Sequence, residues 1–153
     1  MLNRQKILLY LIGRTNTPTP LLSLVKYCFL LNKEGYLKNL ESFYQFLPYR
    51  YGPFSFTMYH VITNLIGTGL IFKHIEHTVT LTDNAQEKSY LLDCDFVIQL
   101  EKFWKIYGGM RMSELISFVY HKYPWFTLNS KTVDRRTVER PLANIAVYTM
   151  GYE

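Results

Sequence analysis

Histidine is the residue type in this chain best suited to chemistry, and its spacing argues against a metal centre. The chain has four histidines, His60, His74, His77 and His121. They form neither an HxxxH pair on one predicted helix nor an HExxH motif. His74 and His77 flank a predicted turn, where a zinc ion would need a third protein ligand from elsewhere in the chain. We therefore predict no metal site, no cofactor and a pair of solvated turn histidines.

A serine nucleophile is the other enzymatic interpretation. Ser113, Ser117 and His121 fall at helical spacing, but neither a G-x-S-x-G turn nor an acidic partner accompanies them. Ser113 is better explained as a helix N-cap, and His121 as a side chain that bonds the last free carbonyls of the same helix. Gly108-Gly109 ends a helix and makes no phosphate-binding loop. We predict that the chain is not an enzyme.

Side chains suited to recognition gather between residues 49 and 77. No lysine or arginine occurs from Tyr51 to Phe72, so the helix predicted there is uncharged. Aromatic surfaces without charge are typical of the centre of protein–protein interfaces. We therefore predict a protein as partner, and homodimerisation is left open. The predicted contact residues are Tyr49, Arg50, Tyr51, Tyr59, His60 and Thr63, with Lys73 and His77 on a neighbouring hairpin.

Nucleic acid is the alternative partner. The formal net charge is +5, and residues 1–40 hold six basic side chains against Glu34 alone, which accounts for all of it. A basic patch there could meet phosphate or an acidic protein surface, or be a solvated helix face. Phosphate contacts supply most nucleic-acid affinity, so the uncharged helix weakens this alternative without removing it. Its contact residues would be Arg4, Lys6, Lys26 and Lys73.

Composition favours one globular domain in the cytoplasm. The chain has 153 residues, of which 48% are apolar, and this is enough for one good core. No run of about 18 apolar residues occurs, so we predict no membrane span. The first residues, MLNRQKILLYLIGRT, fit an amphipathic helix better than a signal peptide. Cys28 and Cys94 form no CxxC motif, and we predict both to be reduced core residues.

Apolar periodicity and capping residues place three helices in the first half of the chain. The first runs from about Asn3 to Ile12. The second, LLSLVKYCFLL, follows Thr19-Pro20, which we interpret as its N-cap and first residue. The third is predicted to use Gly52-Pro53 in the same way and to bury Phe54, Met58, Val61, Ile62 and Leu65. Residues 43–51 are expected to be extended, because prolines disfavour helix before them.

A short ribbon and two further helices follow. Residues 70–74 and 78–82 read as two strands joined by a turn, and Asp83-Asn84 is expected to end the second strand as a turn. Helices are predicted from Asp95 to about Ile106 and from Ser113 to Tyr123. The fold class is therefore mainly α with a small β-ribbon. Three helices followed by a ribbon predict a winged-helix-like core, extended by two or more C-terminal helices.

Three segments are expected along the chain. Residues 1–128 form the binding domain, and residues 129–144 form a charged linker or helix. Residues 145–153 turn apolar again in the pattern of a strand, which needs a neighbour to pair with. We expect them to begin a further, truncated domain of a larger protein.

Short motifs in this sequence resemble the Panacea family, whose members include SocA-like antitoxins and proteolytic adaptors. The first is YRYGPF, Tyr49 to Phe54, between an aromatic segment and a helix. The second is Ser113-Glu114-Leu115 followed by His121-Lys122-Tyr123-Pro124-Trp125, which resembles that family's late helix. With LLSLVKYCFLL, the resemblance covers roughly Pro20 to Phe126.

The resemblance implies a small, mostly helical bacterial protein that acts by binding other proteins, several relatives being toxin antagonists. The hairpin of residues 70–82 and the charged tail depart from the family pattern, and they bear on the antitoxin role more than on the fold. Separately, AVYTMGY, Ala146 to Tyr152, resembles the start of an uncharacterised bacterial domain family. That resemblance implies that residues 1 to about 140 are an amino-terminal module.

Overall fold

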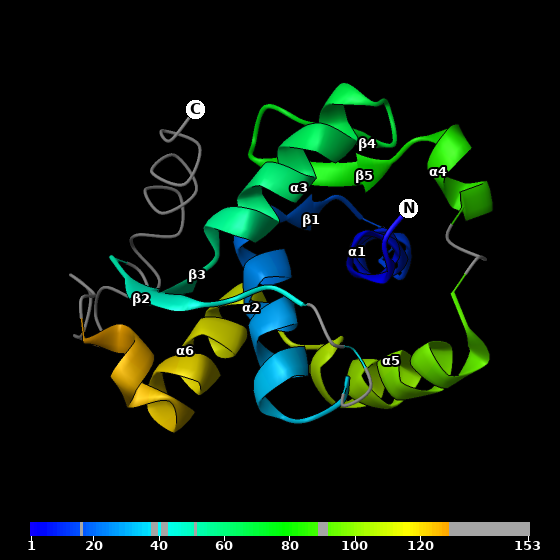
Figure 1. Ribbon diagram of the computed structural model, residues 1–153. Coiled ribbons are helices and arrows are strands. Elements are labelled where there is room, and N and C mark those ends of the chain that lie inside the picture. Colours follow the sequence, from blue (N-terminus) through cyan, green and yellow to red (C-terminus); the bar gives the residue numbers. More distant parts are fainter. Residues whose placement is uncertain (16, 38–39, 41–42, 51, 89–91, 129–153) are drawn as a thin grey trace.

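The computed structural model is mainly helical, with two small antiparallel sheets (Figure 1). It describes residues 1–15, 17–37, 40, 43–50, 52–88 and 92–128, with the backbone alone for residues 86–88. The coarse prediction of an α-rich fold with a small β component is confirmed. The predicted segments 129–144 and 145–153 lie outside the described residues.

Helices and short strands alternate along the first half of the described chain, and helices follow. The first half contains α1 (Asn3–Gly13), β1 (Thr19–Pro20), α2 (Leu21–Lys33), β2 (Leu47–Tyr49), β3 (Gly52–Phe54), α3 (Phe56–Gly67), β4 (Ile71–Lys73) and β5 (Thr78–Leu81). The second contains α4 (Asp83–Lys88), α5 (Cys94–Tyr107), α6 (Met112–Lys122) and the 3-10 helix η2 (Pro124–Thr127).

The larger sheet joins strands that are far apart in the sequence. Its order is β1-β5-β4, so the two-residue strand between α1 and α2 pairs with the second strand of the hairpin. β4 and β5 pair in the register Ile71↔Leu81 and Lys73↔Val79. The other sheet pairs β2 with β3, which lie between α2 and α3 in the sequence. We call β2–β3 the ribbon and β4–β5 the hairpin.

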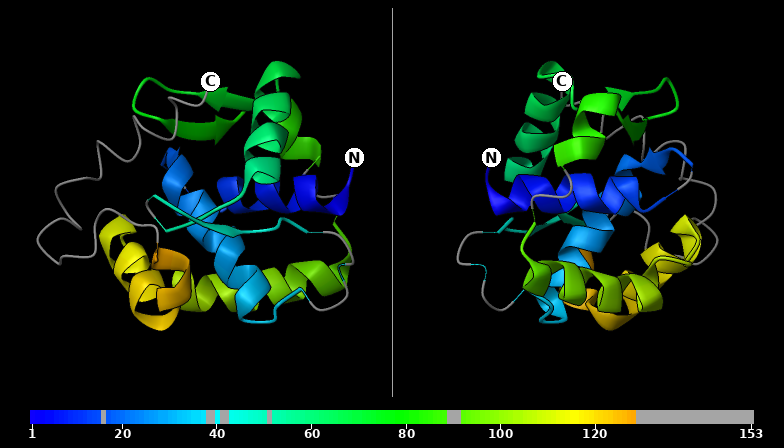
Figure 2. Two further views of the ribbon diagram at one scale, coloured as in Figure 1. Left: turned by 60° about the vertical axis from the view of Figure 1, so that its left-hand side comes forward. Right: turned by 90° about the vertical axis from the view of Figure 1, so that its right-hand side faces the viewer.

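The helix α2 occupies the centre of the molecule. All its residues from Leu21 to Leu31 are buried. A helix that is apolar on all sides is a core helix, because no side of it can face water at low cost. Figure 2 shows α5, α6 and η2 at one end of the molecule and α3, α4 and the larger sheet at the other, with α1 and α2 between them.

Two carboxylates fasten α5 and α6 to the rest of the core. Glu101 on α5 accepts hydrogen bonds from the Tyr10 hydroxyl and from Arg14 Nε, the latter at 2.9 Å. The Tyr10 hydroxyl, followed by Arg14, holds the pKa of Glu101 below its ordinary value. Glu34 accepts from the Tyr107 hydroxyl at 3.0 Å and Lys122 Nζ at 2.7 Å. Burial alone would raise the pKa of Glu34, but these hydrogen bonds lower it.

The start of α3 differs from the prediction. Gly52 and Pro53 belong to strand β3, where Pro53 faces Pro48, and α3 begins at Phe56. Ser55 is the true N-cap, since its Oγ accepts the Met58 N–H at 3.2 Å. The cap rule for Gly-Pro considers the helix start alone, whereas in the structure these two residues pair with β2 across a tight turn, and this pairing decides.

Ser55→Ala should lower the free energy of unfolding by about 1 kcal/mol, the usual cost of losing a serine N-cap. Ser55 is buried, so water does not replace the lost acceptor. Urea denaturation of the purified chain measures this difference. Ser117→Ala, on the exposed side of α6, is the matched control and should change stability by less than about 0.5 kcal/mol. Equal effects of the two substitutions would contradict the cap.

Two further helix starts were predicted wrongly. Thr19-Pro20 is strand β1, and Pro20 rather than Thr19 is the N-cap residue of α2. The pairing of Thr19 with Val79 of β5 holds that residue in an extended conformation. Ser113 lies inside α6, whose N-cap residue is Arg111, because Met112 already packs against the core in the first turn.

Asp83-Asn84 and Cys94 were also predicted wrongly. Asp83-Asn84 opens α4 instead of forming a turn, since these residue types suit helix starts as well as turns. The buried Ala85 fixes α4 on the core, against α1. Cys28 is buried as predicted, but Cys94 is exposed, because it is the first residue of α5, ahead of the first buried position, Phe96.

Candidate protein-binding surface

The helix α3 presents one uncharged face to solvent. Its buried residues are Met58, Val61, Ile62 and Leu65. The exposed residues on the other side include no lysine, arginine, aspartate or glutamate. We call this surface the α3 face and define it as Phe56, Thr57, His60, Thr63 and Asn64.

The structure brings Tyr59, His60 and Thr63 together on α3, as predicted. The Thr63 hydroxyl donates to the Tyr59 carbonyl at 3.0 Å, so its hydrogen bond lies within α3. The Tyr59 and His60 rings lie 6.3 Å apart, centroid to centroid. Tyr59 is half-buried, whereas His60 and Thr63 are exposed. His60 and Thr63 are therefore accessible to a partner. The half-buried Tyr59 ring lies beside His60.

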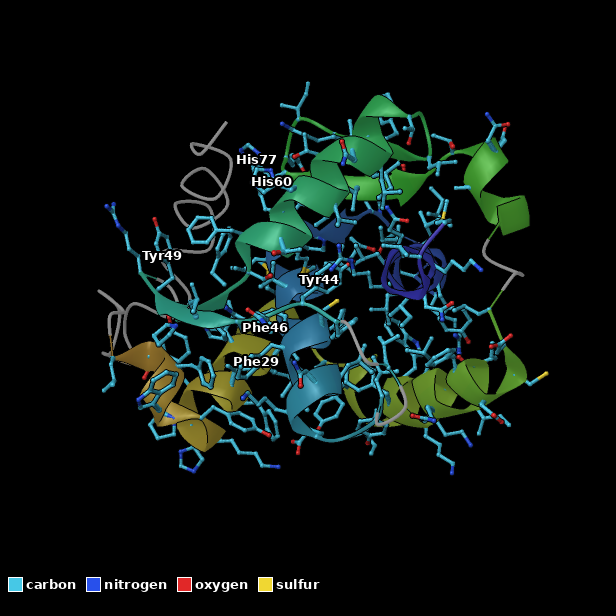
Figure 3. All side chains as sticks on the ribbon, viewed as in Figure 1. Phe29, Tyr44, Phe46, Tyr49, His60 and His77 are labelled. Atoms are coloured by element: carbon cyan, nitrogen blue, oxygen red, sulfur yellow. The ribbon has the colours of Figure 1, made fainter. Side chains whose placement is uncertain are left out.

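An aromatic cluster continues this surface onto the ribbon. It consists of Tyr49, Phe54, Phe56 and Tyr59. The Tyr49 ring lies 5.5 Å from that of Phe54 and 5.7 Å from that of Phe56, and Phe54 and Phe56 are 5.1 Å apart. Figure 3 shows Tyr49 projecting from the ribbon. The cluster joins the ribbon to the first turn of α3, so the two elements form one surface.

Phe56 is a surface residue that the sequence analysis did not select. Its side chain is 42% exposed although it is large and apolar. Phe56, His60 and Thr63 follow the spacing i, i+4, i+7, which places them on one stripe of the helix. This spacing is visible in the sequence and indicates that Phe56 faces solvent with His60. The helix predicted to begin at Gly52-Pro53 instead has Phe54 as the aromatic residue of its first turn.

The other predicted contacts of the ribbon are only partly visible. Arg50 is exposed at the turn between β2 and β3. Tyr51 lies outside the described residues. Gly52 closes this turn with φ +95°, a backbone conformation that glycine adopts without strain.

Lys73 and His77 lie on the hairpin β4–β5, and α3 lies against β4. Lys73 is half-buried in β4. His77 precedes β5 with φ +58°, and its carbonyl accepts the Leu21 N–H at 3.1 Å. His77 therefore joins the hairpin to the first residue of α2. Its backbone has a structural role that the sequence analysis did not foresee.

Lys26 is not on the surface, which corrects its assignment to a basic patch. Its side chain is only 1% exposed, and its Nζ donates to the Pro53 carbonyl at 3.3 Å. Burial lowers the pKa of Lys26 to about 7. Lysine is almost never fully buried, so residue type alone favoured the surface. A phosphate cannot reach this amine.

The remaining basic side chains of the first two helices do not form one patch. The Arg4 guanidinium lies 5.7 Å from the centre of the Tyr44 ring. Lys6 is half-buried on α1. Arg14 is paired with Glu101, and Lys33 lies over the Phe126 ring at 4.8 Å. Arg14 and Lys33 are therefore committed to contacts within the chain.

In the part of the chain that the structure describes, no three His, Cys, Asp or Glu side chains come close enough together to hold a metal ion. No helix in those same residues is both long and apolar enough to cross a membrane.

Comparison with known proteins adds no family. The sequence matches no model of a protein family, and it matches no curated protein. We therefore infer the function from the residues and their geometry.

Proposed function

We propose that this chain is a non-catalytic binding module that acts in the cytoplasm by contact with another protein, in the manner of a Panacea-like antitoxin or adaptor. The observation that carries this proposal is the uncharged α3 face, which adjoins the aromatic cluster of Tyr49, Phe54, Phe56 and Tyr59. The partner is a protein surface that buries rings and uncharged hydrogen-bonding groups, such as a toxin or an effector domain.

The composition of the α3 face supports a protein partner. Phe56 offers exposed apolar area at the start of the face, and His60 and Asn64 offer hydrogen bonds further along it. Burying such groups costs less than burying lysine or glutamate, which is why interface centres are poor in those charges. The contacts of the Tyr49 and Phe54 rings hold Phe56 in place, so little side-chain entropy is lost on binding.

For the fold we propose a winged-helix-like core. The element order α1, β1, α2, α3, β4, β5 and the sheet order β1-β5-β4 support it. In this arrangement the hairpin β4–β5 is the wing, the ribbon β2–β3 is an insertion before the third helix, and α5 and α6 are additions after the wing.

DNA binding is the second candidate, and the order of the elements favours it. In winged-helix proteins the third helix enters the major groove and the wing contacts phosphate. The charges favour it less. Lys26 is buried and the α3 face has no lysine or arginine, which leaves Arg4, Lys6 and Lys73 of the four predicted phosphate contacts. A protein that neutralises few phosphates binds weakly at physiological salt.

A capture experiment separates the two candidates. The tagged chain is incubated with lysate of its native cell, with and without nuclease and at two salt concentrations. The protein proposal expects a partner that survives nuclease and high salt and that binds the purified chain in isothermal titration calorimetry. Nucleic acid that is recovered at low salt and lost at high salt would favour DNA binding instead.

Thr63→Asp should weaken binding of the identified protein partner by about a hundredfold, because it buries an unpaired carboxylate in the interface. Titration calorimetry with the purified partner measures the change. Ser117→Asp adds the same charge at an exposed position of α6 and is expected to leave affinity within about twofold. If both variants bind like the unmodified chain, the α3 face is not the contact surface.

A further inference from the structure

We infer that Lys26 is a positioning residue for the proposed binding surface: by holding the Pro53 carbonyl it fixes strand β3 and the point at which α3 begins. This inference rests on the proposed function for the purpose of the α3 face. The placement of the ribbon itself can be tested on the isolated chain.

The first observation is the short path from Lys26 to the α3 face. Lys26 lies in the middle of α2, and its Nζ donates to the Pro53 carbonyl at 3.3 Å. Two residues further on, Ser55 caps α3, and Phe56 begins both that helix and the α3 face. A movement of Pro53 therefore changes the position of the first turn of α3 directly.

The second observation is the direction of the Pro53 carbonyl. Pro48 faces Pro53, and neither residue has an N–H, so this pair cannot exchange ladder hydrogen bonds. In such an antiparallel pair the carbonyls point away from the partner strand. The Pro53 carbonyl accordingly meets Lys26 on the α2 side. The amine supplies a donor to a carbonyl that points away from β2.

The third observation is the close packing around this contact. A Cβ on Gly52 would lie 2.9 Å from Tyr120 Cε1 and 3.3 Å from Lys26 Nζ. Gly52 therefore lets the ribbon approach both α2 and α6. Tyr120, a titratable side chain of α6, lies on the same side of the ribbon as the amine. The site is built from three elements, and Lys26 is the member that reaches from the core helix to the ribbon.

The fourth observation is that the lysine is fully buried, which disfavours its charged form. Burial lowers the pKa of Lys26 to about 7, so the folded state disfavours its charge. An apolar side chain of similar length would avoid that cost. The hydrogen bond to Pro53 gives this amine a role in placing β3, which an apolar side chain could not take.

Hydrogen–deuterium exchange of the isolated chain tests the inference. In Lys26→Met, the amides of Phe54, Met58 and Tyr59 should exchange about tenfold faster, the effect of losing one hydrogen bond. Amides of α5, such as Leu100 and Phe103, serve as the internal control and should not exchange faster. Unchanged exchange at residues 54–59, or equal acceleration in α5, would overturn the inference.

A spectroscopic readout keeps the test decisive if Lys26→Met fails to fold. In the unmodified chain, the 13C shift of the Pro53 carbonyl should follow the titration of the Lys26 amine. A 13C shift of the Pro53 carbonyl that does not change as the Lys26 amine titrates would overturn the inference. Lys26→Gln, which keeps an uncharged N–H donor, should retain part of the protection at residues 54–59.

The outcomes also separate this inference from the proposed function. Lys26→Met should weaken binding of the identified partner by about tenfold through the displaced α3 face. If exchange at residues 54–59 is unaffected while Thr63→Asp still abolishes binding, the inference fails and the proposed function stands. If exchange accelerates but neither variant alters binding, Lys26 positions the ribbon and the proposed function fails.

Discussion

Lys26→Met should make the chain more stable by on the order of 1 to 4 kcal/mol at pH 7, the range found when buried ion pairs are replaced by apolar side chains. The variant removes an amine whose pKa burial lowers to about 7. Methionine has a similar length and fits an apolar helix interior. Urea denaturation followed by the fluorescence of Trp104 and Trp125 measures the difference.

The same substitution should change how stability depends on pH. The folded pKa of Lys26, about 7, lies below the unfolded value of 10.5. Between these values the unfolded chain binds more protons, so stability rises with pH, by at most about 2.7 kcal/mol from pH 7 to pH 9. The pKa values of Cys28 and Tyr44 are raised by burial, which removes stability above about pH 9 in both proteins.

The profiles of the two proteins should therefore diverge between pH 7 and pH 9. The unmodified chain gains stability over this range relative to Lys26→Met. Lys33→Met, at an exposed position of the same helix, is the control and should keep the slope of the unmodified chain. Parallel profiles for Lys26→Met and the unmodified chain would contradict the burial of this amine.

Phe29→Ala should lower the free energy of unfolding by about 3 to 5 kcal/mol, as is usual for removing a buried phenylalanine. Phe29 on α2 is fully buried, and its ring makes edge contacts with three others. The centroid distances are 5.4 Å to Phe46, 5.2 Å to Tyr123 and 4.7 Å to Phe126. Figure 3 shows Phe46 beside Phe29.

The loss should affect three segments at once, because Phe29 joins α2 to the segment before β2, to the end of α6 and to η2. Urea denaturation measures it. Phe56→Ala, which removes a ring that is 42% exposed, is the control and should cost about 1 kcal/mol or less. A loss below about 1 kcal/mol for Phe29→Ala would mean that these contacts do not hold the segments together.

The helices of the first half and the hairpin were predictable because their apolar spacing is regular. The buried residues Met58, Val61, Ile62 and Leu65 of α3 were predicted by the spacing, whereas Phe54, predicted with them, lies in β3. The same phase places His60 and Thr63 outward, so this part of the candidate site also follows from the sequence.

What the sequence could not predict depends on contacts between distant residues. Nothing near Gly52 in the chain shows that the Pro53 carbonyl meets Lys26, which is 27 residues earlier. The run LLSLVKYCFLL is apolar on every side, and a single lysine within it looks like a surface position until the ribbon is placed against it. Local rules favoured the wrong answer at both sites, because each is decided by packing in three dimensions.

The pairing of β1 with β5 has a consequence for synthesis of the chain. Thr19 and its partner Val79 are about 60 residues apart, and α2, the ribbon, α3 and β4 all lie between them. At about 5 to 20 residues per second, a ribosome needs about 3 to 12 seconds to deliver β5 after β1 has appeared. During that interval α1 and α2 can form locally, but β1 waits without its strand partner. The sheet therefore closes late, and the emerging chain must keep its apolar central helix from other partners until then.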